Sequence, residues 1–382
     1  MSEDRAQCRP FHVLVATPVG VGGQGGIDRI MATLKAALEA RGENTLSVRF
    51  RATRGGRSAW LSPFVTLLFC LAMVVSRLRG QLDLVHINLS QDGSTYRKFL
   101  VAACARLLGL PYVLHLHGAE YHKFWPARGV LAFCIRTLFE GAARVVVLGS
   151  VWRDLIAERA PAAASRVVII PNASLPPTPT HQPPKHQAHI LFLGRIGERK
   201  GVPQLGEALH RMAGLANWKA TIAGDGAVEA AREAARTYGI SDRVDLPGWV
   251  GPETVAELLS TADILVLPSF AENLPVSVIE GMGAGLAVVT TPVGAVRDII
   301  IDGQTGLLAQ PGDVEGLAAA LTRLVNDPSL REHLGAAAKA FHADHLHPTP
   351  FAEAMVRAWR AAAARPAPVH ATPALLEQGS EP

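Results

Sequence analysis

The sequence predicts an α/β protein built from two doubly wound domains that face each other across a cleft. Its 382 residues exceed the ~250–300 residues at which a single hydrophobic core stops growing. Short apolar runs typical of buried strands alternate with helical stretches, which favours parallel sheets covered by helices on both faces. The alternation stops once, at a proline-rich stretch from Pro171 to Pro184 with the composition of a linker, and then restarts.

The first domain is expected to span residues 1–180. An apolar strand at 11–16 leads into a glycine-rich loop at 20–26, which opens an amphipathic helix over 27–41 that Gly42 ends. Further elements are expected as strands at 45–50, 82–87, 112–116, 144–148 and 167–170 and as a helix at 97–108.

The second domain is expected to span residues 188–345. Its predicted strands are 189–193, 219–223, 243–246, 264–267 and 287–290, and its predicted helices are 202–212, 227–238, 252–260 and 276–284. A C-terminal helix is expected over 346–364. The Ala- and Pro-rich residues 365–382 are expected to form a disordered tail.

The two halves of the chain carry opposite charge. The formal net charge is +4, but residues 1–187 hold 22 Lys and Arg against 11 Asp and Glu, whereas residues 188–382 hold 15 against 22. The basic half is expected to face an anionic partner. A phospholipid surface and a diphosphate-bearing substrate both fit. Nucleic acid is not expected, because no run of Lys and Arg is interleaved with aromatic residues.

Composition excludes several classes of protein. Hydrophobic residues make up 49% of the chain and charged residues 18%, so sizeable cores can form. The four cysteines, Cys8, Cys70, Cys104 and Cys134, share no metal-ligand spacing, which indicates a reducing compartment. The polar residues 1–10 do not form a secretory signal. The expected location is the cytoplasm. A small secreted scaffold, a collagen, a repeat array and a polytopic membrane protein are excluded.

One almost uncharged segment, residues 61–76, allows two interpretations. Its sixteen residues are fewer than the ~20 that a helix needs to span a bilayer. It is either a core helix packed on the first sheet or a helix partly exposed at a membrane interface. In the second case anionic headgroups would be bound by nearby basic residues, Arg49, Arg51, Arg54 and Arg57.

The strongest signal for chemistry lies between residues 264 and 294. A strand ends at Leu267, and the loop after it leads into a helix whose first position suits Pro275. Backbone N–H groups at such a helix start attract phosphate oxygens. Glu272 in the loop and Glu280 in the second helical turn can accept hydrogen bonds from sugar and ribose hydroxyls. Two glutamates alone would indicate solvated acids, but this strand–loop–helix context favours a binding role.

The loop from Gly194 to Gly201 directly follows a strand and gives a second signal. Arg195 and Lys200 are expected at the carboxyl end of that strand, where doubly wound sheets bind ligands. Two cations there can neutralise a diphosphate leaving group, although an ordinary basic turn is the alternative. The loop lacks the G-x4-G-K-[ST] spacing of a P-loop.

These passages resemble the retaining glycosyltransferases of family 4, which have the GT-B fold. The Gly-Arg…Lys-Gly loop and the Glu-x7-Glu passage carry the resemblance, which extends through Ala223-Gly224-Asp225-Gly226 and Pro247-Gly248-Trp249-Val250. It covers residues 11–345 and is densest in 188–310. It implies two Rossmann-like domains, with an acceptor site in the first and a nucleotide-sugar site in the second. It also implies retention of anomeric configuration, no catalytic metal and no other cofactor.

The resemblance also implies roles for individual residues. Glu272 matches the acid that contacts the donor sugar, and Glu280 matches the acid that binds the ribose. Arg195 and Lys200 match the pair that holds the diphosphate, and His117 matches the histidine beside the reacting sugar. The other implied donor-binding positions are Gly22, Gly23, Val250, Asn273, Leu274, Pro275 and Val276.

Some positions outside the implied donor site are expected to affect structure rather than chemistry. His115, two residues before His117, is expected to be structural. Asp298 stands where many relatives have glutamate, and Asn172-Ala173 replaces the commoner Asn-Gly. Both departures concern only local loop geometry.

The implied reaction is front-face substitution, in which an acceptor hydroxyl attacks from the side on which the diphosphate leaves. The expected acceptor is a glycan or a polyprenyl-diphosphate-linked glycan. The expected setting is exopolysaccharide or cell-envelope polysaccharide synthesis in bacteria, at the inner face of the cytoplasmic membrane. Three alternatives are a nicotinamide dehydrogenase, a GT-B sugar-nucleotide epimerase, and a non-catalytic nucleotide- or polyanion-binding protein on the same fold.

Overall fold

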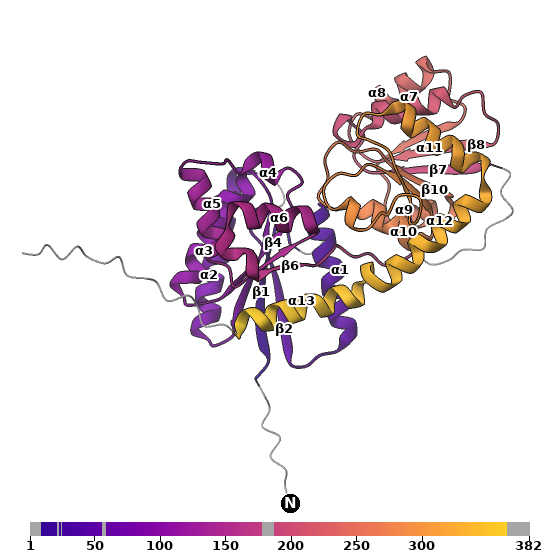
Figure 1. Ribbon diagram of the computed structural model, residues 1–382. Coiled ribbons are helices and arrows are strands. Elements are labelled where there is room, and N and C mark those ends of the chain that lie inside the picture. The colour runs from indigo at the N-terminus through magenta and orange to yellow at the C-terminus, as the bar shows by residue number, and fades with distance from the viewer. Residues whose placement is uncertain (1–8, 21–22, 24, 56–58, 178–186, 365–382) are drawn as a thin grey trace, which may run out of the picture.

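The protein consists of two α/β domains, each built on a six-stranded sheet. The computed structural model describes residues 9–20, 23, 25–55, 59–177 and 187–364. Figure 1 shows the N-terminal domain beside the C-terminal domain, with helices packed around each sheet. The fold class predicted from the sequence, two Rossmann-like doubly wound domains, is confirmed.

The N-terminal sheet is parallel throughout and has the strand order β2-β1-β3-β4-β5-β6. Its strands are β1 (Phe11–Thr17), β2 (Leu46–Ala52), β3 (Leu84–Leu89), β4 (Tyr112–Leu116), β5 (Arg144–Val147) and β6 (Val167–Ile169). Every residue of β3 and β4 is buried, as expected for strands covered on both faces. Because the strands are parallel, their carboxyl ends meet at one edge of the sheet.

Alternate side chains of this sheet enter two different helical layers, since successive residues of a strand point to opposite faces. Leu14 and Ala16 of β1 lie in the core that includes α2 (Ser62–Leu78), α3 (Gly93–Leu107) and α5 (Val130–Glu140). Val13 and Val15 lie in the core that includes α1 (Gly26–Arg41) and α13 (Pro348–Ala363). The other helices of this domain are α4 (Tyr121–Phe124) and α6 (Ser150–Arg159).

The C-terminal sheet is also parallel and has the strand order β12-β11-β10-β7-β8-β9. Its strands are β7 (Ala188–Leu193), β8 (Trp218–Ala223), β9 (Val244–Gly248), β10 (Ile264–Leu267), β11 (Ala287–Thr290) and β12 (Leu307–Leu308). Its helices are α7 (Val202–Arg211), α8 (Val228–Thr237), α9 (Pro252–Thr261), α10 (Val276–Ala284), α11 (Val314–Asn326) and α12 (Pro328–Phe341). Strand β12 was not predicted from the sequence, because its two residues are too few to show the apolar run of a strand.

Single turns complete the structure. They are η1 (Ala59–Leu61), η2 (Pro161–Arg166), η3 (Glu198–Lys200), η4 (Val296–Asp298) and the π turn η5 (His342–Leu346).

Helix α13 returns from the C-terminal domain to the N-terminal one. Figure 1 shows it running from the end of α12 across the N-terminal sheet. Phe351, Met355 and Trp359 are buried in the same core as Val13 and Val15. The predicted C-terminal helix is therefore an integral layer of the first domain.

The first residues of the proline-rich stretch between the domains are held in place by hydrogen bonds to the rest of the protein. Asn172 and Ser174 are buried. The Asn172 amide donates to the carbonyl of Leu274 (3.0 Å), and the Ser174 N–H donates to the carbonyl of Leu346 (3.2 Å). Residues 178–186, the rest of the predicted linker, lie outside the described residues, as do residues 365–382 of the predicted tail.

The apolar segment at 61–76 forms most of α2, which is buried on one face and exposed on the other. One face packs on the sheet through Phe69 and Met73, while Phe64, Leu67 and Leu71 on the other face are exposed. In the described part of the chain, no helix is long and apolar enough to cross a membrane.

Candidate active site

A cavity of about 690 Å³ lies between the two domains, at the carboxyl ends of their strands. In the C-terminal sheet the strand order reverses between β7 and β10, and open parallel sheets bind ligands at such a reversal. The loops that follow these two strands carry the predicted cations and acids. The predicted site residues that line the cavity are His117, Arg195, Lys200, Val250, Glu272, Asn273, Leu274, Pro275, Val276 and Glu280.

Lys200 and Glu272 form an ion pair at the centre of this reversal. Lys200 Nζ, after β7, lies 2.5 Å from Glu272 Oε1, after β10, and both side chains are largely buried. The chain turns directly after Lys200 at Gly201, whose φ is +69°. A side chain at Gly201 would collide with the carbonyl of Pro268, so glycine is required for the two loops to approach this closely.

Two arginines add positive charge beside this ion pair. Arg195 is exposed and lines the cavity. Arg199, which sequence analysis missed, also lines it. The Arg199 guanidinium donates to the carbonyl of Ala271 (2.8 Å), and its own carbonyl accepts from the N–H of Phe270 (2.9 Å). Arg199 therefore holds the loop after β7 against the loop after β10 while it contributes charge.

The loop after β10 is fixed from both domains. The Asn273 amide donates to the carbonyl of Leu116 (3.1 Å), at the end of β4 in the N-terminal domain. On the other side, Gly294 packs so closely that a side chain there would collide with the carbonyls of Glu272 and Asn273. These contacts set the start of α10 at the cavity wall. Through its hydrogen bond to Leu116, the Asn273 side chain links the two domains.

Helix α10 begins at the cavity, and its first N–H groups lack partners within the helix. Pro275 is the N-cap residue with extended backbone angles, and Val276 is the first helical residue. The helix predicted over 276–284 is confirmed, and Pro275 is its N-cap rather than its first helical residue. The proline ring fixes the entry into the helix, and the free N–H groups follow it. Such a helix start attracts anionic oxygens.

Glu280 lies further along α10 and faces a cation from the other domain. Arg29 Nη2 of α1 lies 2.6 Å from Glu280 Oε1. Burial raises the pKa of Glu280, and the charge of Arg29 opposes this shift. Sequence analysis missed Arg29, because only the folded chain brings α1 to α10.

His117 reaches the cavity from the loop after β4, and Asn88 orients it. His117 Nε2 lies 2.8 Å from Asn88 Oδ1, and Asn88 Nδ2 donates to the carbonyl of Ala16 (3.1 Å). An amide oxygen only accepts hydrogen bonds, so the His117 Nε2 must carry the proton. Burial and the neighbouring His86 lower the pKa of His117 to about 3. The neutral ring therefore keeps a lone pair on Nδ1.

His115 and His86 lie behind His117, away from the cavity lining. The rings of His115 and His117 have centroids 4.0 Å apart, and His115 is fully buried. Trp359 of α13 donates to His86 Nδ1 (3.0 Å). Both histidines are part of the core of the first domain. Among the described residues, no three His, Cys, Asp or Glu side chains come together as metal ligands.

The glycine-rich loop after β1 is only partly described. Gly22 lies outside the described residues. Gly23 packs on the carboxylate of Asp28, which accepts from the N–H of Val19 (3.2 Å). In the described part of this loop, Gly26 lines the cavity and Gly23 does not. Through these two contacts the Asp28 carboxylate fixes the position of the loop relative to α1.

Asp298 and Trp249 also lie where the two domains meet. Asp298 accepts a hydrogen bond from the Ser150 hydroxyl (2.7 Å), so it joins the two domains and does more than shape its own loop. Trp249, beside Val250, lines the cavity with an exposed indole ring.

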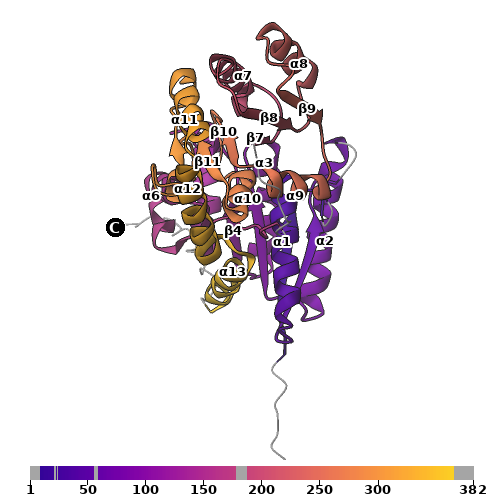
Figure 2. The same ribbon diagram turned by 90° about the vertical axis from the view of Figure 1, so that its right-hand side faces the viewer.

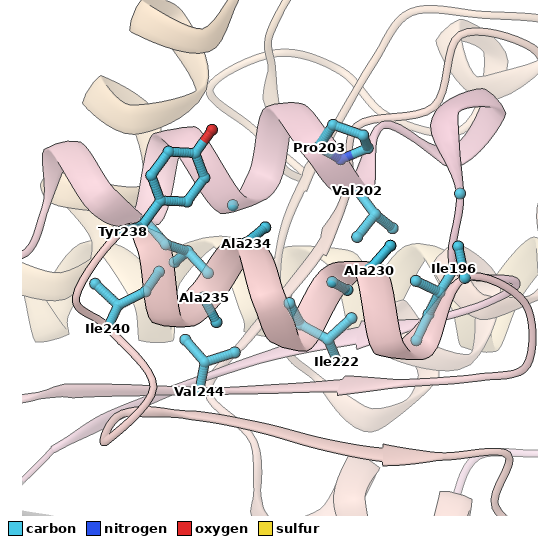
Figure 3. Close-up of a pocket in the computed structure, with 15 residues that line it drawn as sticks. Ile196, Val202, Pro203, Ile222, Ala230, Ala234, Ala235, Tyr238, Ile240 and Val244 are labelled. Carbon is cyan, nitrogen blue, oxygen red and sulfur yellow. The ribbon is translucent and has the colours of Figure 1, made fainter.

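A second cavity of about 140 Å³ lies between α7 and α8 and has a different character. Figure 3 shows Val202, Ile222 and Val244 around it, and its described lining contains no charged side chain. A diphosphate would have no cation there. The larger cavity between the domains is therefore the candidate active site.

Comparison with known proteins identifies the family of the chain. A family model described as "Glycosyl transferase 4-like domain" matches residues 9–173. A second, described as "Glycosyl transferases group 1", matches residues 179–341. The first match includes β1 to β6, and the second includes β7 to β12.

Relatives and solved structures extend across both domains. A 2-deoxystreptamine glucosyltransferase of Streptomyces kanamyceticus is 27% identical over 297 residues, which are 72% of this chain and 75% of that protein. A sucrose-phosphate synthase from Thermosynechococcus elongatus shares the fold with a TM-score of 0.73 at 20% identity, over 92% of this chain and 98% of that one. Anabaena Alr3699/HepE in complex with UDP and glucose has a TM-score of 0.70 at 16% identity, over 91% and 98%. The chain belongs to the GT-B glycosyltransferases of family 4.

Proposed function

We propose that the protein is a retaining, metal-independent glycosyltransferase that uses a nucleotide-sugar donor. The acceptor is a hydroxyl of a glycan or of a polyprenyl-diphosphate-linked glycan in exopolysaccharide or cell-envelope synthesis. The enzyme works in the cytoplasm, at the inner face of the membrane. One observation carries this proposal: Arg195, Arg199 and Lys200 line the same cavity as Glu272 and Glu280.

This pattern of charge supports a nucleotide-sugar donor. The cations after β7 and the N–H groups of α10 suit a diphosphate. Glu280, one helical turn further, suits the ribose hydroxyls, and the exposed Trp249 suits a stacked base. UDP-sugars are the first donors to test, because Anabaena Alr3699/HepE has the same fold and binds UDP and glucose.

The cations lower the barrier by stabilising the charge that builds on the departing diphosphate. The sugar–phosphate bond breaks as the acceptor oxygen bonds to the anomeric carbon from the same side, and the acceptor proton passes to the leaving phosphate. Glu272 binds the donor sugar and stabilises its positive charge. His117 Nδ1 accepts a hydrogen bond from a sugar hydroxyl.

The charge of the N-terminal half supports a lipid-linked acceptor. Residues 1–187 carry twice as many basic as acidic residues, which suits a diphosphate-linked lipid at an anionic surface. The Streptomyces relative is named for transfer to 2-deoxystreptamine, so a small polar acceptor is the alternative that a direct assay must include.

A donor and acceptor panel tests this function. Purified protein is incubated with UDP-, GDP- and ADP-sugars, together with membrane lipid extract, a soluble glycan or 2-deoxystreptamine, and nucleotide release is measured. We expect release that needs one donor class and rises with the lipid extract, and that persists with a chelator. Free sugar released without any acceptor would indicate the epimerase. Binding without turnover under every condition would indicate a non-catalytic protein.

A further inference from the structure

Helix α2 presents an apolar face to solvent. The exposed side chains recur every three or four residues, so they form one continuous stripe. Their exposed fractions are 59% for Phe64, 59% for Leu67, 47% for Leu68, 57% for Leu71, 37% for Val75 and 81% for Leu78. Trp60, in the turn directly before the helix, is 93% exposed.

The side of α2 that faces the protein is the more polar one. It buries Ser62, Thr66 and Ser76 together with Phe69 and Met73. The Thr66 hydroxyl donates a hydrogen bond to the carbonyl of Thr53 (2.8 Å). A helix on the surface of a water-soluble protein shows the opposite arrangement. The outer face of α2 therefore has the character of a surface that an apolar partner covers.

Neighbouring helices extend this surface. Helix α3 packs against α2, and α5 packs against α3. Both views show α2 at an outer edge of the N-terminal domain (Figures 1 and 2). The exposed residues of α3 and α5 that continue the stripe are Tyr96, Leu100, Leu107, Val130 and Phe133. We call these residues, together with the α2 stripe and Trp60, the apolar face.

The charges around the apolar face are basic. Neither α2 nor α3 contains an Asp or a Glu. Arg77 and Arg79 are exposed at the C-terminal end of α2, and Arg54 is exposed beside its first turns. The segment with Arg54 is held there, since Thr66 bonds to Thr53 and Gly55 lies against Val65. An apolar stripe with arginines at both ends matches the acyl chains and anionic headgroups of a bilayer.

We propose that the apolar face docks the enzyme on an anionic lipid bilayer, with α2 lying in the plane of the membrane. The basic residues that contribute are Arg54, Arg77 and Arg79. Arg51, which is also exposed, lies on β2. Arg49 donates to the carbonyl of Gln81 (2.7 Å) and is engaged within the protein. Arg57 lies outside the described residues.

A second copy of the chain fits this surface less well. A symmetric dimer places the same patch against itself. That arrangement would bring the arginines of two chains together, and the two helices offer no carboxylate to compensate them. A bilayer with anionic headgroups supplies the missing charge.

The position of α2 also indicates that the acceptor reaches the cavity from the bilayer. This conclusion rests on the proposed function. Because β1 and β2 are parallel, α2 starts near the sheet edge at which the cavity lies. A lipid carrier can therefore stay in the bilayer beneath the apolar face while its polar head reaches the cavity. The inferred acceptor is a membrane-embedded lipid-linked sugar.

Vesicle flotation with matched double variants tests the docking surface. The full-length protein is mixed with vesicles of phosphatidylcholine alone or with phosphatidylglycerol added. The variant is Leu67→Glu/Leu71→Glu, and the control is Leu175→Glu/Ile301→Glu, which changes two exposed apolar residues elsewhere. Melting temperatures are compared to confirm that both variants fold.

We expect flotation of the wild type and the control with phosphatidylglycerol, and about tenfold weaker binding of Leu67→Glu/Leu71→Glu. Arg77→Glu/Arg79→Glu should also weaken binding, and salt should weaken it in the wild type. Wild-type protein that does not float, or a Leu67→Glu/Leu71→Glu variant that floats as well as the control, would overturn the inference. So would a wild-type dimer that this variant converts to a monomer.

Donor turnover separates this inference from the proposed function. Nucleotide release is measured for each variant with the donor and with membrane lipid extract dissolved in detergent as the acceptor. Normal release by Leu67→Glu/Leu71→Glu, with lost transfer to the lipid acceptor in vesicles, is the expected result. If no protein releases nucleotide but the flotation pattern holds, the proposed function fails and the docking surface stands.

Discussion

Arg29 Nη2 of α1 and Glu280 Oε1 of α10 lie 2.6 Å apart and join the two domains across the cavity. The Glu280 side chain is only 12% exposed, whereas that of Arg29 is 52% exposed, so the carboxylate is shielded from water and the guanidinium is not. Ribose hydroxyls of a bound donor would compete with Arg29 for this carboxylate. We therefore expect donor binding to weaken the contact between the domains at Glu280.

Glu280→Ala is expected to weaken donor binding more than it slows bound-state chemistry. Loss of a hydrogen bond to a charged group costs about 1.5–3 kcal/mol, so the donor KM should rise about 10- to 100-fold while kcat changes little. Steady-state kinetics with a varied donor measure both. Glu257→Ala, on the exposed side of α9, is the control. An unchanged donor KM in correctly folded Glu280→Ala would contradict the ribose assignment.

Lys200→Ala is expected to depress turnover, because it removes a cation from the departing diphosphate. Loss of a comparable preorganised donor costs about 2.7–4 kcal/mol, or about 10²- to 10³-fold in kcat. The exposed Lys219 provides the control variant, Lys219→Ala. Arg195→Ala should act in the same direction. Full activity with both Lys200 and Arg195 replaced would place the donor elsewhere.

His117 is expected to act as a neutral hydrogen-bond acceptor throughout the physiological range. Its pKa, lowered by burial to about 3, keeps the ring uncharged above about pH 4. His117→Ala should lower kcat/KM about tenfold, the larger effect of one lost hydrogen bond. The pH profile of kcat/KM should keep the same shape in wild type and His117→Gln. An acidic limb near pH 6.5 that disappears in the variant would show that His117 titrates.

The free energy of unfolding is expected to fall in mild acid because of His86. Burial lowers the pKa of this fully buried histidine to about 4. Between about pH 6.5 and that value the unfolded chain binds a proton that the folded chain does not. Stability is therefore present above about pH 6.5 and is lost as the pH falls through this window. One such group contributes at most about 1.4 kcal/mol per pH unit.

Urea denaturation at several pH values measures this effect. His86→Gln should unfold with a shallower pH dependence, whereas the exposed control His333→Gln should follow the wild type. If the free energy of unfolding changes with pH equally in His86→Gln and in the wild type, His86 is not the cause of the pH dependence.

The fold and most of the site were predictable because their signals are local. Buried parallel strands give continuous apolar runs, as at Ile264–Leu267, and such runs are visible in the sequence. The acids and cations follow these strands directly, so the fold brings Lys200 to Glu272 once the strands pair. The ends of helices and strands shift by a few residues because the boundaries depend on hydrogen bonds that a pattern does not specify.

The contacts between distant segments were not predictable from local pattern. Arg29 looks like any exposed residue of an amphipathic helix until α10 lies beside it. Asn88 is one of two polar residues, with His86, in an otherwise apolar strand, and only the folded sheet shows that it orients His117. Helix α13 has the pattern of a helix but nothing that indicates which domain it covers. Its amphipathic stripe meets the N-terminal sheet through Trp359.

Time-resolved NMR of the transfer reaction tests the central claim most directly. The anomeric proton of the product is followed while a UDP-α-sugar is turned over with the acceptor that gives the highest rate of nucleotide release. We expect an α-linked product that appears in step with free UDP in the wild type and is strongly reduced in Lys200→Ala. A β-linked product, or free sugar released as UDP accumulates, would contradict a retaining transferase.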